Sequence, residues 1–290
     1  MSVALAAGWI VAHPWTWRMP WGQSGLLRVT SIDVGQGDAT LVTLPDATTL
    51  LVDTGGLGMD AAFDIGARVV APAIWARRVG RLDGLLLTHG DPDHIGGAAT
   101  IIDVFRPSSI WEGIVVPSHA PMEALRAQGR ACGLLWQTLV EGADWERGGV
   151  RLHVWSPAPP DWERPRVRND DSVVLELRYR DVSIVLPGDI GRDVERDLAA
   201  RIPPSPLRVL KLAHHGSATS TSEAFLEALR PSIALVSCGR DNRFGHPASD
   251  VMARLAARHI PVLRTDSAGE IDLFTDGRTV TVHTPPDRNP

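Results

Sequence analysis

Four residues with metal-binding side chains lie within six positions of the sequence, in the segment THGDPDH. They are His89, Asp91, Asp93 and His94, and they follow directly after the apolar run LDGLLL. Such a run predicts a buried strand, and a tight loop at its end can direct several side chains toward one point. Imidazole and carboxylate groups together suit divalent ions such as zinc or manganese. The segment therefore predicts a metal-binding loop, and a chance cluster at a polar turn is the alternative.

Three further segments place polar side chains at the ends of expected strands. They are IVLPGD, LKLAHHGS and the turn GHP, and they contain the candidate residues Asp189, Lys211, His214, His215 and His246. Each segment alone is compatible with an ordinary turn. Together with the first loop, they predict a centre of two divalent ions at one edge of a sheet sandwich, where two ions activate water and hold both oxygens of an in-line displacement.

The elements that must position these residues alternate between strands and helices. Strands are expected over 26–35, 38–45, 48–56, 82–90, 108–116, 207–217 and 232–239, in a hairpin over 171–189, and within 136–168 and 262–285. Helices are expected over 59–79, 94–105, 120–132, 192–201, 222–230 and 248–259. Because no linker of the kind that separates domains occurs after residue 26, we expect one domain over 25–290, with two sheets and outer helices.

The overall charge limits the classes of partner. The 290 residues carry a formal net charge of −5, which gives no global reason to expect a polyanionic partner. A nucleic-acid site would therefore need a local basic patch. The candidates for it are loop arginines beside the motifs, and solvated loops are the alternative: Arg164, Arg166, Arg168, Arg240 and Arg243. The two cysteines are far apart and lack CxxC spacing, which excludes a disulfide framework and a zinc knuckle.

Residues 1–24 form an apolar leader in which tryptophans crowd the later half. The apolar run is too short to span a bilayer, for which about 20 residues are needed. It also lacks the basic segment that opens a signal peptide. Tryptophan is enriched where membrane helices leave the bilayer. We therefore expect 1–24 to be the tail of a transmembrane helix of a larger membrane protein, and a short amphipathic or disordered leader on a soluble enzyme is the alternative.

The motifs resemble those of the metallo-β-lactamase fold hydrolases. That family has a His-x-His-x-Asp-His loop, an earlier Asp that ends a strand, a bridging Asp after Gly, and a late His. Asp53 in LLVDTGG matches the early Asp, Asp189 the bridging one, and the segment from His89 to His94 the loop. The resemblance implies an α/β fold, the αββα sandwich of two mixed β-sheets flanked by helices, and a centre of two divalent ions.

Within that family, a more specific motif set is similar to the C-terminal domain of the ComEC proteins, the DNA-uptake channels of competent bacteria. It consists, in order, of DVGQGDA, LTHGDPDHIGG, NDDSVVLEL, LPGD, KLAHHGS, GHP and RTDSAGEI, and it covers the chain from Leu26 to about Val282. This resemblance implies a DNA phosphodiesterase, an exonuclease that degrades the non-transforming strand. It also implies a single-stranded DNA substrate, a membrane channel part in the full-length protein, and a monomeric, extracytoplasmic domain at the bacterial cell membrane.

Two positions depart from the wider family's pattern. Asp91 stands in place of the second His of the loop, and Asn169, Asp170 and Asp171 replace a Gly-His-Thr turn. Both changes exchange nitrogen for oxygen or remove a ligand. An oxygen-richer site favours manganese, with zinc or magnesium as the alternatives.

The resemblance carries a set of metal ligands onto this sequence: His89, Asp91, Asp93, His94, Asp189, His214, His215 and His246. Which of the last three supplies the late ligand stays open, with more weight on the pair His214 and His215. The residues expected to serve catalysis are Asp93, Lys211 and Asp53, where Lys211 would hold a phosphate or stabilise developing negative charge. An exposed lysine at a strand edge is the alternative. Asp38, in the Gly-rich turn, is expected to support the ligands rather than bind metal.

Two other functions stay open at this point. A small-molecule hydrolase acting on an ester, lactone or thioester is compatible with the wider family, and the negative net charge favours it mildly. A non-catalytic module that binds DNA or gates a channel is compatible with the change at Asn169. The intact loop from His89 to His94 favours an enzyme.

Overall fold

The structure is a computed structural model that describes residues 25–56 and 63–285. The expected leader over 1–24 lies outside the described residues. Within the two described ranges, no helix combines the length and the apolar character that crossing a membrane requires.

An eight-stranded mixed sheet has the order β15-β14-β1-β2-β3-β4-β5-β6. Strands β3 to β6 run parallel, and the remaining neighbours are antiparallel. The central strands β3 and β4 are buried along their whole length, as continuous apolar runs in parallel sheets usually are. The bounds are β1 (Leu27–Ser31), β2 (Thr40–Thr43), β3 (Thr49–Val52), β4 (Gly84–Leu87), β5 (Ser109–Glu112), β6 (Leu135–Thr138), β14 (Ile271–Thr275) and β15 (Val280–His283).

A second, seven-stranded sheet has the order β13-β12-β11-β10-β9-β8-β7. Its strands β10 to β13 are parallel, and β7 to β10 are antiparallel. In β8, every second residue is buried, because one face of this strand packs on the core. The bounds are β7 (Asp144–Arg147), β8 (Val150–Ser156), β9 (Val174–Tyr179), β10 (Val182–Leu186), β11 (Leu207–Lys211), β12 (Ile233–Val236) and β13 (Val262–Arg264).

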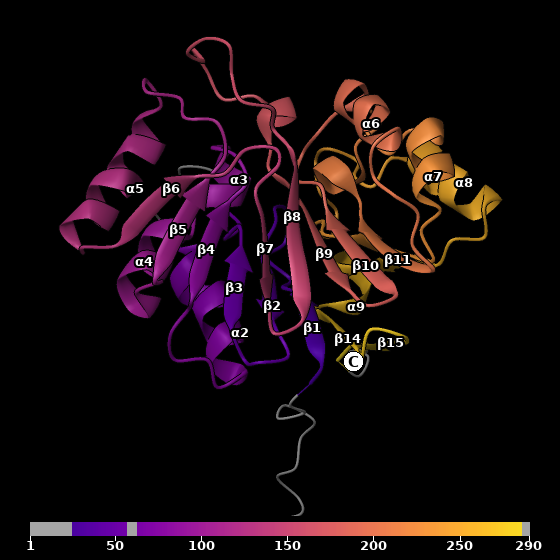
Figure 1. The fold of residues 1–290 in the computed structure, drawn as a ribbon, viewed down its shortest axis with the longest axis horizontal. Helices are drawn as coiled ribbons and strands as arrows, with labels where there is room; N and C mark the ends of the chain where they lie inside the picture. The colour runs from indigo at the N-terminus through magenta and orange to yellow at the C-terminus, as the bar shows by residue number, and fades with distance from the viewer. Residues whose placement is uncertain (1–24, 57–62, 286–290) are drawn as a thin grey trace, which may run out of the picture.

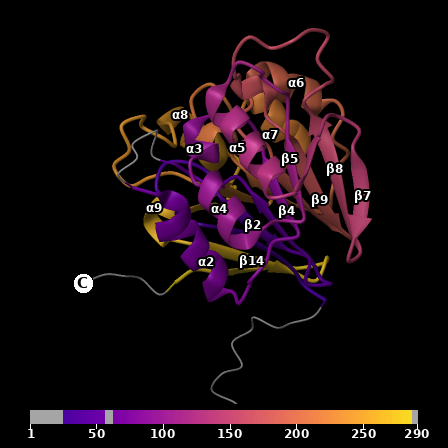
Figure 2. The ribbon, with the colours of Figure 1, turned by 90° about the vertical axis from the view of Figure 1, so that its left-hand side faces the viewer.

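Helices cover the outer face of each sheet (Figures 1 and 2). The first sheet is covered by the short π-helix η3 (Gly66–Val70), α2 (Ala71–Ala76), α4 (Ala98–Phe105) and α5 (Ala120–Ala131). The second sheet is covered by α6 (Arg192–Ala199), α7 (Glu223–Leu229) and α8 (Ser249–Ala257). Single turns occur in the connections: α3 (Pro92–Ile95), η4 (Asn169–Asp171), η5 (Ala213–Gly216) and α9 (Thr265–Ala268).

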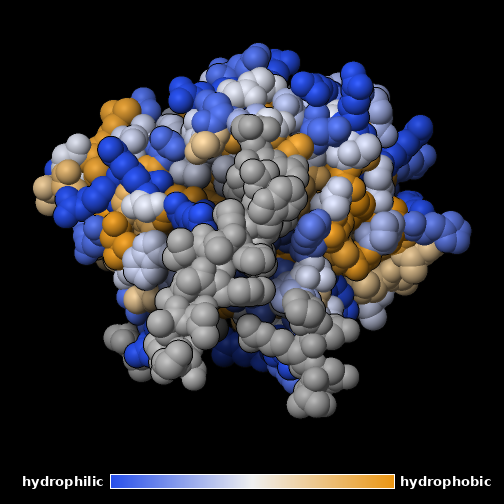
Figure 3. Space-filling model, turned by 90° about the horizontal axis from the view of Figure 1, so that it is seen from below, coloured by the Kyte–Doolittle hydropathy of each residue, from blue (hydrophilic) through white to orange (hydrophobic). Residues whose placement is uncertain are grey.

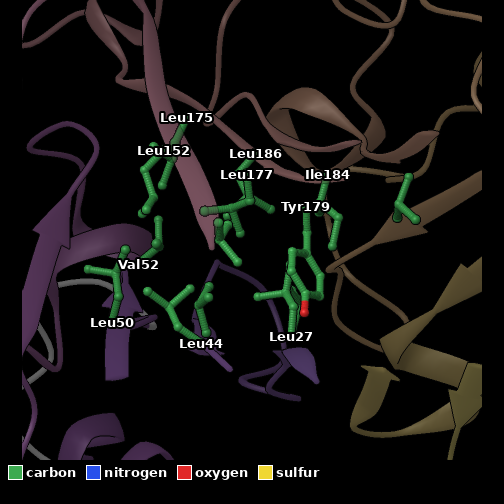
Figure 4. Packing of buried hydrophobic residues seen from close by; sticks show 14 of the residues in the cluster. Leu27, Leu44, Leu50, Val52, Leu152, Leu175, Leu177, Tyr179, Ile184 and Leu186 are labelled. Atoms are coloured by element: carbon green, nitrogen blue, oxygen red, sulfur yellow. The ribbon is translucent and has the colours of Figure 1, made fainter. Parts of the chain in front are cut away.

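The central hydrophobic core lies between the two sheets (Figure 4). Side chains of the first sheet face those of the second, including Leu27, Leu44, Leu50, Val52, Leu152, Leu175, Leu177, Tyr179, Ile184 and Leu186. Two further clusters join each sheet to its helices. This layering confirms the predicted αββα sandwich of two mixed sheets flanked by helices.

Local differences from the predicted elements have local causes. The helix predicted over 94–105 is divided, because α3 begins at Pro92, a favourable first helical residue, and the turn ends before Gly96 and Gly97. Within the described part of 59–79, the chain forms a π-helix followed by α2 rather than one uniform helix. The segment 262–285 contains the turn α9 in addition to its strands.

The loops that carry the predicted site follow strands that end at one edge of the sandwich. This is the upper edge in Figure 1, beside α3. The opposite face, seen from below in Figure 3, shows hydrophilic and hydrophobic patches around the grey atoms. The carboxyl ends of β3, β4, β10 and β11 therefore bring together residues that are far apart in the sequence.

Candidate metal centre

Four strand ends position the central residues of the site. Asp53 follows β3, His89 lies two residues after β4, Asp189 follows β10, and His215 lies in η5 directly after β11. Asp53 and His215 have backbone φ values of 58° and 54°, a left-handed conformation that residues other than glycine rarely adopt. Such conformations concentrate at functional sites, where the surrounding structure must hold them in place.

His94 lies between two buried carboxylates. Its side chain is fully buried, its Nδ1 is 2.8 Å from Asp53 Oδ2, and its Nε2 is 3.2 Å from Asp189 Oδ1. Asp53 also accepts hydrogen bonds from the backbone N–H and the hydroxyl of Thr88, at 2.8 and 2.7 Å. With both oxygens engaged in this way, Asp53 orients His94, and the Nε2 side of the ring faces the centre.

His215 repeats this arrangement from the second sheet. Its Nδ1 is 3.1 Å from the Ser237 carbonyl oxygen and 3.5 Å from Asp38 Oδ1. Its Nε2 is 3.3 Å from Asp93 Oδ2 and 3.7 Å from Asp189 Oδ2. One oxygen of Asp189 thus faces each histidine, so this carboxylate lies where it can bridge two ions.

The atoms that face the centre fit a divalent metal. Among the described residues, four such buried atoms make no hydrogen bond of good geometry, and their polar neighbours are other groups of the site: Nε2 of His89, His94 and His215, and Oδ1 of Asp189. A buried polar atom without a partner costs about 1–3 kcal/mol and calls for an explanation. Ligand atoms within 4.8 Å of one another occur in several groups, among them His89, His94 and Asp189, and Asp93, His94 and His215. Mixed imidazole and carboxylate donors of this kind bind borderline or hard divalent ions.

The centre is strongly charged when it holds no metal. Burial lowers the pKa of His94, but the Asp189 and Asp53 carboxylates outweigh it and raise this pKa well above its usual value. Burial likewise opposes the charged form of His215, whose pKa the carboxylates of Asp189 and Asp38 raise to about 10. Burial raises the pKa of Asp189, but His94 and His215 outweigh it and hold this pKa well below its ordinary range.

Three of the predicted ligands lie at the mouth of the centre. The Asp91 side chain is 37% exposed, with Oδ2 3.4 Å from His89 Nε2. The His214 side chain is 29% exposed, and its Nε2 is 3.8 Å from Asp189 Oδ2. The His246 ring centroid is 5.7 Å from that of His214 and 6.3 Å from that of His215. The structure therefore separates the His pair, with His215 inside and His214 at the mouth, and the ligand role of each residue stays a prediction.

Lys211 does not point into an open cleft. Its side chain is buried, and its ammonium forms an ion pair with Asp38, a residue to which the sequence assigned only a supporting place. Burial raises the pKa of Asp38, but Lys211 outweighs it and lowers this pKa below its ordinary range. The Lys211–Asp38 ion pair lies on the Nδ1 side of His215. The ammonium therefore holds in place the carboxylate that faces this nitrogen. The sequence did mark Lys211 as unusual, because it is the only lysine in the chain.

The motif DVGQGD joins the two sheets across the centre. The Asp38 N–H donates to the Asp93 carbonyl at 3.0 Å, and the Asp38 carbonyl accepts from Gly55 N–H at 2.7 Å. The Ser237 hydroxyl donates to the Gly37 carbonyl at 2.7 Å. Gly37 has φ 130°, and a Cβ there would lie 2.5 Å from the Asp93 carbonyl oxygen, so the turn requires glycine. The motif thus holds the metal-binding loop against the end of β12.

The three residues of the segment Asn169–Asp171, which the resemblance places at a Gly-His-Thr turn, have different contacts. Asn169 Nδ2 lies 3.4 Å from His214 Nε2, at the mouth of the centre. Asp170 accepts the Gly191 N–H at 2.8 Å, and Asp171 pairs with Arg164 at 3.0 Å. Asn169 therefore borders the centre, whereas the two acidic residues hold neighbouring loops in place.

Comparison with known proteins identifies the family. A family model described as the metallo-beta-lactamase superfamily matches residues 32–240. The chain belongs to this superfamily. The matched range contains all the predicted metal ligands and catalytic residues except His246. Metallo-beta-lactamase domains typically bind two divalent metals, in agreement with the candidate ligand groups of this structure.

Curated relatives of this metallo-beta-lactamase chain include competence proteins. ComE operon protein 3 of Bacillus subtilis (strain 168) is 33% identical over 274 residues, which cover 90% of this chain and 35% of that protein. Competence protein ComA of Neisseria gonorrhoeae is 31% identical over 274 residues, or 94% of this chain and 35% of that protein. The chain thus spans about a third of the length of these relatives. Among solved structures, the metallo-beta-lactamase fold protein YhfI from Bacillus subtilis shares the fold, with a TM-score of 0.54, 10% identity, and coverage of 89% of this chain and 100% of that one.

Replacing Lys211 with methionine is expected to lower the free energy of unfolding by about 3–5 kcal/mol, because the Asp38 carboxylate then stays buried without its cation. Urea denaturation of the metal-free protein measures this loss. The double variant Lys211→Met, Asp38→Asn should recover part of it. The matched control is Arg196→Met, which breaks an exposed ion pair with Asp193 and should change stability by less than about 1 kcal/mol. A Lys211→Met protein as stable as the control would contradict the assigned role.

Proposed function

We propose that residues 25–290 form a divalent-metal-dependent phosphodiesterase domain that shortens single-stranded DNA during DNA uptake. The observation that carries this proposal is the place of Asp189, with one oxygen toward His94 and the other toward His215. The superfamily supports a metal-dependent hydrolase, and relatives named for competence support a role in DNA uptake. With a net charge of −5, a DNA site must be a local basic patch.

We infer that one ion is held by the group His89, His94 and Asp189. A second would be held by His215 with Asp93 and Asp189, whose carboxylates are 3.3 and 3.7 Å from its Nε2, and Asp91, His214 and His246 lie at the mouth. Two bound divalent ions supply Lewis acidity to the phosphodiester and lower the pKa of water. Manganese is our preferred ion, with zinc or magnesium as the alternatives, because Asp91 offers an oxygen where the wider family's loop has a histidine nitrogen.

The chain's own residues orient these ligands. Asp53 and Asp38 face Nδ1 of His94 and His215, respectively, so the Nδ1 proton of each neutral ring points away from the centre and leaves Nε2 available. Asn169 and His214 border the mouth, where the phosphate of an entering strand would pass. Asp93 is the acidic residue that links the loop after β4 to His215.

In the full-length protein, we propose that this domain is attached to a membrane channel and lies on the extracytoplasmic side of the bacterial cell membrane. The length of the relatives, about three times that of this chain, supports a further part. As an isolated domain, the chain is proposed to be monomeric.

The test of this function is a cleavage assay with the purified chain and manganese, magnesium or zinc. End-labelled single-stranded DNA should be shortened, and duplex DNA should be cut more slowly. Circular single-stranded DNA should stay intact, because an exonuclease needs an end. If linear DNA stays intact while a lactone or nitrocefin is cleaved, the domain is a small-molecule hydrolase and the proposal fails. DNA binding with less than one ion per chain in saturating manganese would instead indicate a non-catalytic module.

A further inference from the structure

The loop between β12 and α8 carries an exposed aromatic ring beside the metal centre. Phe244 is 53% exposed. Its ring centroid is 5.8 Å from that of His246, and the two planes are inclined by 26°. The His246 ring is in turn 6.3 Å from the His215 ring, with planes inclined by 24°. A row of three rings, each inclined to the next by 26° or 24°, therefore leads from the surface to the ligand group around Asp189.

The loop that presents Phe244 is held by its own hydrogen bonds. The Asn242 amide donates to the carbonyl oxygens of His246 and Gly239, at 2.6 and 2.9 Å, and accepts the His246 N–H at 3.0 Å. The Gly239 N–H donates to the Gln36 side-chain oxygen at 3.3 Å. These hydrogen bonds hold the turn that carries the ring, so a ligand that stacks on the ring binds to a surface that is already ordered.

Positive charge accompanies the exposed ring. The Arg243 guanidinium lies over the Phe244 ring, with its carbon 4.9 Å from the ring centroid. Arg240 is also exposed, and Asp241 is the only acidic residue of the segment 240–247. An exposed aromatic ring next to guanidinium groups is the combination by which proteins hold unpaired bases and their phosphates.

We propose that Phe244 is a stacking platform for an unpaired nucleobase of the polynucleotide strand that enters the metal centre, where the base takes the place of the Arg243 guanidinium on the ring, and that Arg243 then binds a neighbouring phosphate. This inference rests on the proposed phosphodiesterase function and deepens it. Bases in a duplex are stacked on both faces, so a platform of this kind favours a single strand. The base would lie beside Phe244, whose ring centroid is 5.8 Å from that of the predicted ligand His246, which in turn is 6.3 Å from that of His215.

The experiment compares two substrates that differ only in their bases. One is a short oligothymidylate, and the other is a strand of equal length in which the bases are replaced by abasic residues. KM is measured in manganese for the wild type, Phe244→Ala, Phe244→Trp and Arg243→Ala. The control is Trp75→Ala, which removes an aromatic side chain that is 51% exposed on α2, at the lower end of the first sheet in Figure 1.

Phe244→Ala is expected to raise KM for the oligothymidylate about tenfold, the loss of one base–aromatic stack, and to leave KM for the abasic strand within about twofold. Phe244→Trp should retain the wild-type preference for the strand with bases. Arg243→Ala should raise KM for both substrates, and Trp75→Ala should change KM for neither. Equal effects of Phe244→Ala on the two strands, or no effect on either, would overturn the platform.

A binding measurement separates this inference from the proposed function. If the wild type leaves both strands uncut, the phosphodiesterase proposal fails, and fluorescence anisotropy of the same two labelled strands then decides the platform. A wild-type preference for the strand with bases that Phe244→Ala abolishes would support the platform even without cleavage. Equal Kd values for the two strands in the wild type would overturn it.

Discussion

Replacing Asp189 with asparagine is expected to lower the manganese-dependent rate of DNA cleavage about a thousandfold, which corresponds to about 4 kcal/mol of transition-state stabilisation. The two oxygens of this carboxylate face His94 and His215. An amide would keep the shape but lose the negative charge, and one of its two terminal atoms would become an N–H donor. The variant should also bind fewer than two ions per chain, as measured by elemental analysis after dialysis.

The matched control for Asp189→Asn is the same exchange at an exposed site. Asp197 lies on α6, with a side chain that is 62% exposed, and Asp197→Asn should keep the wild-type rate and metal content. Circular dichroism and urea denaturation of Asp189→Asn show whether the fold is retained. Metal content is the decisive readout, because a purely structural role would not reduce it in a folded variant. A folded variant that binds two ions and cleaves DNA normally would show that Asp189 does not bridge.

The loop from His89 to His94 could be predicted from the sequence because its residues are neighbours in the chain. Their side-chain directions could not. Asp91 directly precedes α3 with extended backbone angles, whereas Asp93 and His94 lie within its single turn, and successive helical residues point about 100° apart. As a result, His94 is fully buried, and Asp91 is partly exposed at the mouth of the centre.

The spacing of residues in the sequence could not indicate which carboxylates contact the Nδ1 atoms of the buried histidines. Asp53 and His94 are 41 residues apart, and Asp38 and Lys211 are 173 residues apart. These contacts exist only because β3 and β4 are parallel neighbours and because the Gly37 turn reaches across to the second sheet. The pattern of apolar runs predicts that strands form, but the meeting of two sheet edges depends on the complete order of strands.

Local backbone angles explain the arrangement of the two adjacent late histidines. His214 and His215 are adjacent in sequence, and both have left-handed backbone angles. These angles direct the buried His215 toward Asp189 and leave His214 at the mouth. A sequence motif therefore predicts the pair as part of the site, while the backbone conformation of η5 decides which ring lies inside.

The metal-free protein is expected to lose stability as the pH rises from 6.5 toward 10. The pKa of His215 is raised from 6.5 to about 10 in the folded state, and that of His94 is also raised well above 6.5. The folded state therefore binds more protons than the unfolded state in this window. The stabilisation is complete below pH 6.5 and disappears as the pH passes the folded-state values. The slope is about 1.4 kcal/mol per pH unit for each histidine that stays protonated only when folded.

Manganese should show the opposite dependence, because binding requires neutral imidazoles and replaces the protons of the buried histidines. The rise in the unfolding midpoint on adding manganese should therefore grow from pH 6.5 to about 8.5. Thermal unfolding with and without manganese measures both curves. His215→Asn should flatten them, whereas His283→Asn, an exchange on the exposed end of β15, should leave them unchanged. The metal-free midpoint could instead rise with pH, and manganese could raise it by the same amount at every pH. In that case, the carboxylates of Asp53, Asp189 and Asp38 would not keep the buried histidines protonated in the metal-free protein.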